Sequence, residues 1–341
     1  AELTAGPSAM GVVDDRIADV RLHIRGNTKT LVDEVPRGFL QVVSLQDQPK
    51  ISEKQSGRLE LANYLTAKEN PLTARVMANR VWHWLFGQGI VRTVDNFGVM
   101  GERPSNPELL DHLAHEFIAN DWSVKQLVRE IVLSRTYRLA SDHHEQNFAK
   151  DPENLLVWRQ NHRRLDAESI RDAILAMSGN LERKPATSSP VAKLAGVNIG
   201  RQTTNLEQST GKAFRHRSVY MPVLRNALPE ALAVFDFAEP SIIVGRRQIT
   251  TVPSQALYMM NSEFVVEQSE AVAQQLRQEE EMDSSERITK AYRIALGRSP
   301  NADELEKTKA FMSSFDDAKN DVALAAVCQA LIASAEFRYI E

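Results

Sequence analysis

The sequence predicts a mainly α-helical protein, a multi-helix bundle with a few short β-strands and long irregular loops. Apolar residues recur at helical spacing in many segments, for example in residues 107–119, where they fall on one face of a helix. Residues that cap helices precede these segments and glycines follow them, as at Asn106 and Gly87. The strict alternation that indicates a strand is confined to short stretches such as residues 20–24.

Length and composition exclude several classes of protein. The chain has 341 residues, 43% of them apolar, which suggests about two domains with ordinary hydrophobic cores. Its 41 Lys and Arg against 45 Asp and Glu give a net charge of −4, so there is no overall positive field to attract nucleic acid or an anionic membrane. No apolar run is long enough for a membrane span, and the first residues lack the pattern of a signal peptide. Cys328 is the one cysteine, which leaves no disulfide, c-type haem motif or cysteine zinc cluster.

The chain divides into three expected regions. Residues 1–55 are a joining segment with short strands at residues 20–24 and 39–43. Residues 56–261 are a helical core that also contains a long loop and a pair of short strands. Residues 262–341 are a C-terminal helical bundle packed on that core.

Four helices are expected in the first half of the helical core, over residues 56–66, 71–86, 107–119 and 124–134. Asn70-Pro71 and Asn106-Pro107 each suit a helix start, and Ser123 with Gln126 has the pattern of a capping box. The core-facing stripe of the second helix is predicted to comprise Leu72, Val76, Met77, Val81, Trp84 and Leu85, with Trp82 and Phe86 as a further apolar edge.

The second half of the helical core is more irregular. Polar residues 141–150 predict a connection, Asp151-Pro152 predicts a new helix start, and a helix is expected from residue 166 to Gly179. Residues 182–212 have no sustained periodicity, and a loop of that length is usually functional or disordered. Two short strands are expected after this loop, at residues 217–226 and 249–252.

The C-terminal region is predicted to consist of helices alone. The first begins after Ser262, the second ends at Gly297, and Asn301 with Glu304 forms a capping signal for the third. The apolar run around Cys328 forms the last, where a buried structural thiol is expected rather than a nucleophile.

The glycine-rich loop at residues 87–104 is the first candidate site. It follows a helix rich in aromatic residues, and its glycines allow tight turns that larger residues resist. The candidate ligand-binding residues of this loop are Arg92, Glu102 and Arg103.

Clustered arginines form the second candidate site. Guanidinium groups match carboxylates, sulfates and phosphates, so several that converge would bind an anion or an acidic sugar. The candidate arginines are Arg163, Arg164, Arg217, Arg225, Arg246 and Arg247. The alternative is an arginine–carboxylate network inside the fold, which the alternating charges of residues 162–172 favour.

Other motifs give less support to specific chemistry. His112, His115 and Glu116 share a polar helix face, but their order matches no zinc-protease motif, and His143-His144 lies in a polar loop; we expect no metal site. The indoles of Trp82, Trp84 and Trp158 either stack on sugar rings or belong to the core. The chain contains no nucleophile, phosphate-loop or dinucleotide motif. Glu102, Asp172, Glu230, Asp236 and Glu239 supply carboxylates, but catalytic residues stay unknown from the sequence.

Long collinear motifs carry a resemblance to a known family. They include VPRGFL, NPLTARVMANRVWHWLFGQGIVRTVDNFGVMGERPSNPELLD, RRLDAESIRDAILAMSG, RSVYMPVLRNALPEALAVFDFAEP and GRRQITTVPSQALYMMNS. From about Val35 onward the chain resembles the planctomycete PSD-one domain, the C-terminal domain of unknown function of cytochrome-c-type multidomain proteins. An aromatic residue is usual in that family near position 112, where this chain has His112, which argues further against a metal site.

The resemblance implies a setting and partners. It implies a periplasmic or secreted fragment of a longer protein, with upstream cytochrome-c-like and uncharacterised domains as partners. Any haem would belong to the separate upstream domain, and no cofactor is expected in this fragment. The family supplies no catalytic residues. Its association with haem modules, and with bacteria that degrade sulfated polysaccharides, implies a role with complex glycans or in electron transfer.

The leading functional prediction is an accessory module of an exported multidomain protein that binds an anionic glycan or a partner domain. One alternative is a carboxylate-dependent enzyme acting on complex polysaccharides, with Glu102, Asp172 or Asp236 in the site. The other alternative is a purely structural docking domain. Nucleic-acid binding is the least expected function, because the basic residues are scattered.

Overall fold

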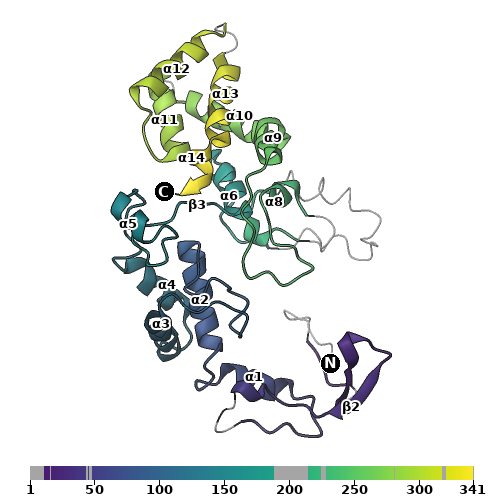
Figure 1. The fold of residues 1–341 in the computed structure, drawn as a ribbon. Helices are drawn as coiled ribbons and strands as arrows, with labels where there is room; N and C mark the ends of the chain where they lie inside the picture. Colours follow the sequence, from purple (N-terminus) through teal and green to yellow (C-terminus); the bar gives the residue numbers. More distant parts are fainter. Residues whose placement is uncertain are drawn as a thin grey trace. The chain divides into compact units, whose positions relative to one another are not determined.

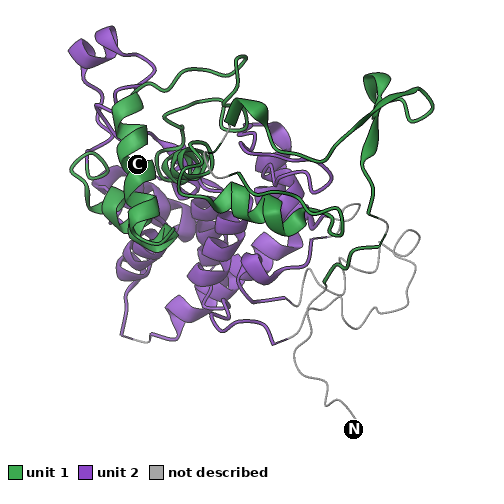
Figure 2. Cartoon of the chain, turned by 90° about the horizontal axis from the view of Figure 1, so that it is seen from below, with its two compact units in different colours: residues 1–138 green, residues 139–341 purple. Residues whose placement is uncertain are grey.

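The computed structural model describes residues 11–340 except 16, 44, 46–47, 188–213, 224–227, 280 and 317–319. Over these residues the protein is mainly α-helical, with two small two-stranded sheets, which confirms the predicted fold class (Figure 1). No helix in the described ranges is both long and apolar enough to cross a bilayer. The chain forms two compact units, residues 1–138 (unit 1) and 139–341 (unit 2), coloured separately in Figure 2. The domain boundaries predicted after residues 55 and 261 stay predictions.

Unit 1 begins with a β-hairpin. Strand β1 (Val20–His23) pairs antiparallel with β2 (Leu31–Val35), and the 3-10 helix η1 (Ile24–Gly26) lies between them. The strand predicted at residues 39–43 is wrong, because Gln41–Val43 form the 3-10 helix η2. This segment packs on α1 (Arg58–Thr66) instead of pairing: the Tyr64 hydroxyl donates to the Val43 carbonyl at 2.8 Å.

Three further helices build the core of unit 1: α2 (Thr73–Phe86), α3 (Pro107–Ala119) and α4 (Val124–Leu133). Each of the three contacts the other two. The side chains of Asn106 and Ser123 accept hydrogen bonds from the backbone at the starts of α3 and α4, which confirms both as capping residues. Gly87 ends α2 in the left-handed region, at φ 80°, as expected.

The core stripe predicted for α2 is wrong for Trp84, which is 53% exposed. The buried face instead carries Ala74, Ala78, Val81, Trp82 and Phe86. Trp82 and Phe86 stack with ring centroids 4.1 Å apart. The apolar edge predicted beside the main stripe of α2 therefore belongs to the buried face. Both α3 and α4 pack against α2, and the small alanines on its buried face allow a close approach.

Unit 2 begins with two departures from the predictions. Residues 145–150 form the short helix α5 (Glu145–Lys150) where a connection was expected, since Glu, Gln, Ala and Lys all favour helix. Asp151 starts no helix. Its carboxylate accepts hydrogen bonds from the Leu155 and Leu156 amides at 2.9 and 2.8 Å, which stabilises a turn instead.

The strands of unit 2 also differ from the prediction. Strand β3 (Arg163–Arg164), which no pattern indicated, pairs antiparallel with β4 (Tyr339–Ile340). The strand predicted at residues 217–226 is wrong over residues 217–223, because Ser218–Tyr220 form the 3-10 helix η4, and its last three residues lie outside the described ones. Residues 249–252 form no strand either, since the Thr250 amide donates to Asp236. Most of the predicted loop at residues 182–212 lies outside the described residues, although Glu182 forms an isolated bridge with His216.

The remaining helices of unit 2 enclose one hydrophobic core. They are α6 (Ala167–Met177), α8 (Glu230–Val234), α9 (Pro253–Asn261), α10 (Glu263–Arg277), α11 (Ser284–Leu296), α12 (Ala302–Ser313), α13 (Asn320–Ala333) and α14 (Ala335–Arg338). Helices α10 and α13 pack along each other, and fully buried side chains such as Met259, Ile288 and Ile332 fill the interior. Cys328 is buried there as expected, and burial raises the pKa of its thiol to about 12.

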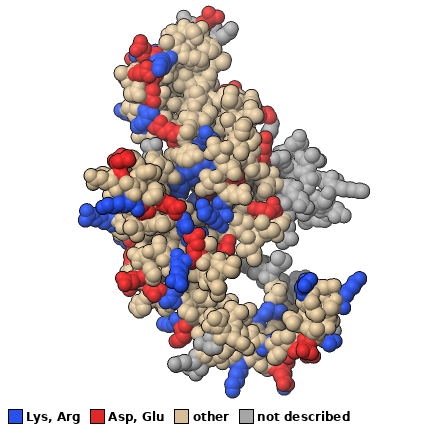
Figure 3. Space-filling model, in the orientation of Figure 1, with Lys and Arg blue, Asp and Glu red and all other residues tan. Residues whose placement is uncertain are grey.

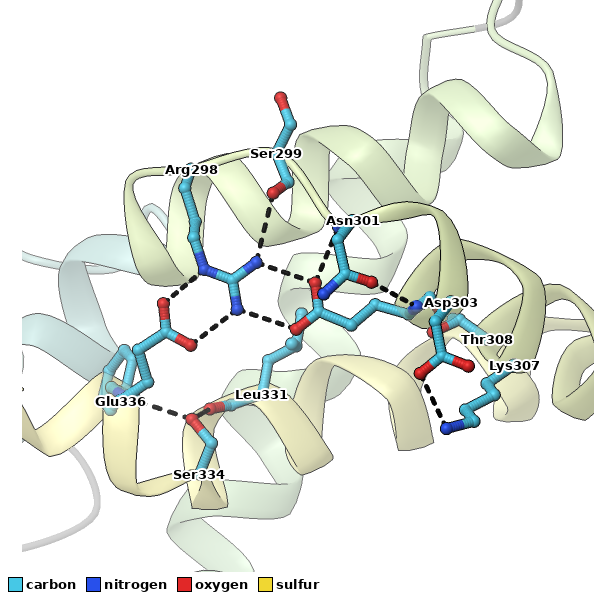
Figure 4. Close-up of polar contacts among 11 residues, drawn as sticks. Arg298, Ser299, Asn301, Asp303, Lys307, Thr308, Leu331, Ser334 and Glu336 are labelled. Carbon is cyan, nitrogen blue, oxygen red and sulfur yellow. Dashed lines mark hydrogen bonds and ion pairs between the residues drawn. The ribbon is translucent and has the colours of Figure 1, made fainter.

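One arginine connects the C-terminal helices. Arg298, after α11, donates to Glu304 of α12 through two bonds of 2.8 Å and to Glu336 of α14 through bonds of 2.6 and 2.7 Å (Figure 4). Glu304 also completes the predicted capping box with Asn301. The hydrogen bonds from Arg298 lower the pKa of Glu304 to about 2.

Candidate functional site

The loop at residues 87–104 is held at its start by a buried amide. Asn79, on α2, is fully buried; its Nδ2 donates to the Val91 carbonyl at 2.9 Å, and its Oδ1 accepts from the Val91 amide at 2.8 Å. A Cβ on Gly89 would lie 2.5 Å from the Val91 carbonyl oxygen, so this position requires glycine. The start of the loop is therefore fixed to the helix.

Residues 93–102, which we call the apex turn, are held by their own hydrogen bonds. The Thr93 hydroxyl donates to the Asn96 carbonyl at 2.8 Å and accepts from the Glu102 amide at 3.0 Å. The Gly101 amide donates to the Gly98 carbonyl at 2.9 Å, which closes a β-turn around the two residues between them. A Cβ on Gly101 would lie 2.1 Å from the Asn96 carbonyl oxygen.

The two central residues of this β-turn are apolar and project into solvent. Val99 is fully exposed and Met100 is 89% exposed. Turn centres usually carry Gly, Pro, Asn, Asp or Ser, so two adjacent apolar side chains on a well-bonded turn are unusual. The sequence analysis predicted a site in this loop but did not include Val99 and Met100 in it. Their position as two adjacent apolar residues between Gly98 and Gly101 is the sequence feature that could have indicated them.

Three charged residues of the loop form ion pairs, within the loop or with α2. Arg92 Nε and Glu102 Oε2 lie 2.6 Å apart, so two of the three predicted residues form one ion pair. Asp95 accepts a hydrogen bond from Arg80 of α2 at 3.3 Å. The third predicted residue, Arg103, is exposed. On the face in Figure 3, basic and acidic side chains are interspersed.

In unit 2, Arg164 lies at the centre of a buried polar cluster. Its guanidinium donates to the Asp236 carboxylate at 2.7 Å, to the Phe235 carbonyl at 3.2 Å and to the Thr250 carbonyl. The Asp236 carboxylate also accepts from the Thr250 amide and hydroxyl, both at 2.8 Å. The Gln255 side-chain amide donates to the Thr250 carbonyl at 3.1 Å. The cluster thus links β3, the end of α8, the segment before α9 and α9 itself.

These bonds determine the protonation of Asp236. Desolvation acts to raise the pKa of Asp236, but the hydrogen bonds from Thr250 and Arg164 outweigh it and lower the pKa below its ordinary value. The carboxylate is therefore ionised at neutral pH. It neutralises a guanidinium whose side chain is only 3% exposed.

Arg171 forms a second buried cluster, which the sequence indicated only as part of a charge network. Its guanidinium donates to the carbonyls of Phe214 and His216 and to the Ser218 hydroxyl, the last at 3.1 Å. Burial lowers the pKa of Arg171. The neighbouring Asp172 accepts from the Ser218 amide at 2.8 Å and from its hydroxyl at 2.7 Å. These bonds hold residues 214–218 on α6.

The other predicted arginines have different environments. Arg247 forms a two-point ion pair with Glu168, at 2.6 and 2.9 Å, and lies 4.9 Å from the centroid of the Phe237 ring. The hydrogen bonds to Glu168 raise the pKa of Arg247. Arg163 is half-buried in β3, whereas Arg217 and Arg246 are exposed. Arg225 lies outside the described residues.

A family comparison covers both candidate regions. The family model for PSD1, described as a protein of unknown function (DUF1553), matches residues 57–312. The chain belongs to the PSD1 family. No curated protein and no solved structure matches it.

The PSD1 match includes the apex turn and the clusters around Arg164, Arg171 and Arg247, but not the β1–β2 hairpin or α13. Because the family has no established function, membership identifies the region and assigns no role to any residue. The candidate site must therefore be interpreted from its own chemistry.

The tryptophans and histidines considered in the sequence analysis form no binding site of their own among the described residues. Trp82 is buried, and the indole of the half-buried Trp158 donates to the Asp151 carbonyl at 2.9 Å. His112 lies 3.4 Å from Glu130, and His115 lies 3.7 Å from Glu116. In the part of the chain that the structure describes, no group of three or more His, Cys, Asp or Glu side chains could hold a metal ion.

The carboxylates named as catalytic alternatives are each bound to a partner: Glu102 to Arg92, Asp172 to Ser218, and Asp236 to Arg164 and Thr250. Glu239 is exposed and accepts from the Ser241 amide at 3.0 Å, and Glu230 is exposed at the start of α8. The described aspartate and glutamate side chains with a resolved pKa shift are all shifted downward: Asp14, Asp19, Asp111, Asp236, Asp283 and Glu304. A general acid requires the opposite direction.

Proposed function

We propose that this PSD1 chain is a docking module of an exported multidomain protein, and that it binds a partner domain through the apex turn. The observation that carries the proposal is the exposure of Val99 and Met100 on a turn whose backbone is fixed by hydrogen bonds. A turn that is ordered before binding loses little conformational entropy when it enters a pocket.

The partner of this proposal is an upstream domain of the same protein, cytochrome-c-like or uncharacterised, as the family resemblance implies. Its complementary surface is an apolar pocket, because the apex presents two adjacent apolar side chains. The ion pair between Arg92 and Glu102, partly exposed on both sides, suits the polar rim of such an interface. The exported location rests on the resemblance.

The environments of the buried arginines support docking over anion binding. Arg164 and Arg171 are almost completely buried, and main-chain carbonyls together with a carboxylate or a hydroxyl accept hydrogen bonds from the terminal Nη1 and Nη2 groups of both. Arg247 already holds a carboxylate in the two-point geometry that an anionic sugar would need. An anionic glycan would have to compete with these internal partners.

The test is a titration of the chain with the purified upstream domains, followed by calorimetry. Full burial of a Val or Met side chain is worth about 1.5–3 kcal/mol, so the V99D/M100D variant should bind at least about 100-fold more weakly. The matched control is I242D/I243D, which changes another pair of adjacent exposed apolar residues, in unit 2. Equal binding by V99D/M100D and wild type would refute the docking role of the apex turn.

The rival function is a carboxylate-dependent enzyme. It requires turnover of a polysaccharide panel that is lost in E102Q, D172N or D236N while the variant stays folded. The downward pKa shift of Asp236 places this function second, because an ionised carboxylate held by Arg164 and Thr250 has no proton to donate.

A further inference from the structure

Two basic segments of unit 2 lie side by side. Glu182 forms an isolated parallel bridge with His216, and the Glu182 amide donates to the Arg215 carbonyl at 2.9 Å. The His216 Nδ1 lies 3.0 Å from the Lys184 carbonyl oxygen, so the imidazole also reaches the neighbouring segment. Residues 182–184 and 214–217 are therefore held together.

The segment at residues 214–217 is extended and fixed. Arg171 of α6 donates to the carbonyls of Phe214 and His216, whereas the Arg215 carbonyl accepts from the neighbouring segment. Carbonyls that alternate in direction are characteristic of an extended backbone, in which alternate side chains share a face. Phe214 is buried in the core of unit 2, so Arg215 and Arg217 project from the opposite face, and both are exposed.

Arg183 extends this face. Residues paired in a bridge project to the same side, so Glu182 lies on the side of His216, and Arg183, the next residue, lies on the side of Arg217. Arg183 is exposed as well. Residues two apart in an extended segment are about 6.6–6.8 Å apart, and neighbouring segments lie about 4.7–4.9 Å apart. We call the surface formed by Arg183, Arg215 and Arg217 the basic face.

The described residues do not neutralise the basic face. No carboxylate in the described part of the chain forms an ion pair with Arg183, Arg215 or Arg217. Glu182 projects to the other side of the bridge, where its Oε1 accepts from the Lys184 amide at 2.9 Å. Like charges at this spacing repel one another, so a ligand with several negative charges relieves the repulsion.

The spacing and the surroundings indicate the class of ligand. Guanidinium groups match carboxylates, and an extended peptide places alternate side chains about 6.6–6.8 Å apart, the spacing of Arg215 and Arg217. Val219 and Tyr220, which follow in η4, are 68% and 37% exposed and add apolar surface that the side chains of a peptide can cover. The net charge of −4 gives no overall field for a long polyanion such as nucleic acid.

We propose that Arg183, Arg215 and Arg217 bind an extended acidic segment of a protein partner, with carboxylates at alternate positions. The bonds from Arg171 fix the backbone that carries two of the three arginines, so little backbone ordering accompanies binding. This site belongs to unit 2 and is independent of the docking proposal for the apex turn of unit 1.

The site should be tested with the full chain and a fluorescent decapeptide that has glutamate at alternate positions, with valine and threonine between. For three exposed charge-assisted contacts the expected Kd is on the order of 0.1 mM at low salt, measured by fluorescence anisotropy. Binding should weaken severalfold between about 50 and about 300 mM salt, because the contacts are exposed. A peptide with glutamine in place of every glutamate should bind at least tenfold more weakly.

Two variants identify the basic face as the binding surface. R215Q/R217Q should weaken peptide binding at least tenfold, whereas R215K/R217K should recover part of it, because lysine keeps the charge but not the two-point geometry. The matched control is R129Q/R135Q, which removes two exposed guanidinium groups in unit 1 and should bind the peptide as wild type does. Melting temperatures establish that each variant is folded.

Three results would overturn the proposal. The first is equal binding of the acidic peptide by R215Q/R217Q and wild type, and the second is a wild-type chain that does not bind it at up to about 5 mM. The third is tighter binding of a heparin hexasaccharide or a single-stranded oligonucleotide than of the peptide, which would contradict the class of ligand. V99D/M100D should bind the acidic peptide as wild type does, which separates this site from the docking function.

Discussion

Replacement of Asp236 by asparagine isolates the charge of the Arg164 cluster. Asp236 has a φ of +60°, a backbone conformation that Asn tolerates as well as Asp, and the Asn oxygen can still accept from Thr250. What changes is the charge opposite Arg164, whose side chain is 3% exposed. Removal of one partner of a buried ion pair costs about 3–5 kcal/mol.

The expected cost for D236N is smaller than that range, at about 2–3 kcal/mol, because the carboxylate is 16% exposed and the amide keeps one acceptor. For a unit of this size each kcal/mol lowers the melting temperature by about 2–4 °C, so D236N should melt about 4–12 °C lower. Far-ultraviolet circular dichroism during heating measures the shift. E239Q, at an exposed carboxylate nearby, is the matched control and should melt within about 1 °C of wild type.

The acid side of the stability curve gives a second readout of the same change. Because the pKa of Asp236 is lower in the folded protein, its contribution to stability is complete above the ordinary carboxyl pKa of about 3.9 and is lost as pH falls through the folded pKa. D236N should therefore lose less stability on acidification than wild type. A D236N protein that melts with wild type at every pH would refute the structural role of this cluster and return Arg164 to the list of possible ligand-binding groups.

Three further predictions concern other parts of the chain. The contribution of Glu304 to stability should be complete above about pH 4.5 and be lost toward its folded pKa of about 2; acid titrations of E304Q should be flatter, and parallel curves would contradict this. Cys328, buried and with a thiol pKa of about 12, should react with a thiol reagent only after denaturation, and rapid labelling of the native protein would show the burial to be wrong. G101A should accelerate amide hydrogen exchange across the apex turn, because its Cβ would lie 2.1 Å from the Asn96 carbonyl oxygen, whereas G98A, with 3.3 Å to the nearest atom, should not.

Local signals predicted helices well because the interactions that decide them lie within a few residues. The caps at Asn106 and Ser123, the capping box at Asn301 and the helix ends at Gly87 and Gly297 all follow the expected pattern. Each depends on a side chain or a left-handed residue that the sequence displays directly.

Predictions that depended on distant partners were less successful. The buried face of α2 is set by α3 and α4, so a stripe read from α2 alone placed Trp84 in the core. The first part of the strand expected from residue 217 is replaced by the 3-10 helix at Ser218–Tyr220, because Arg171 and Asp172, more than forty residues earlier, hold Ser218.

The candidate site could be predicted only in outline. Arginine and carboxylate residue types were evident, but the sequence could not show that Arg164 would meet Asp236 or that Arg247 would meet Glu168, over separations of 72 and 79 residues. The preference for an arginine–carboxylate network over an anion site came from charge alternation, and these pairs agree with it. The exposure of Val99 and Met100 depends on the complete fold of the loop.

Hydrogen–deuterium exchange of the chain with and without the purified upstream domains tests the central claim most directly. If the apex turn enters a pocket of a partner domain, amides of residues 95–102 should become protected in the complex by at least about tenfold, while α12 in unit 2 stays unchanged. A complex that forms while residues 95–102 exchange as in the free chain would contradict docking through the apex turn.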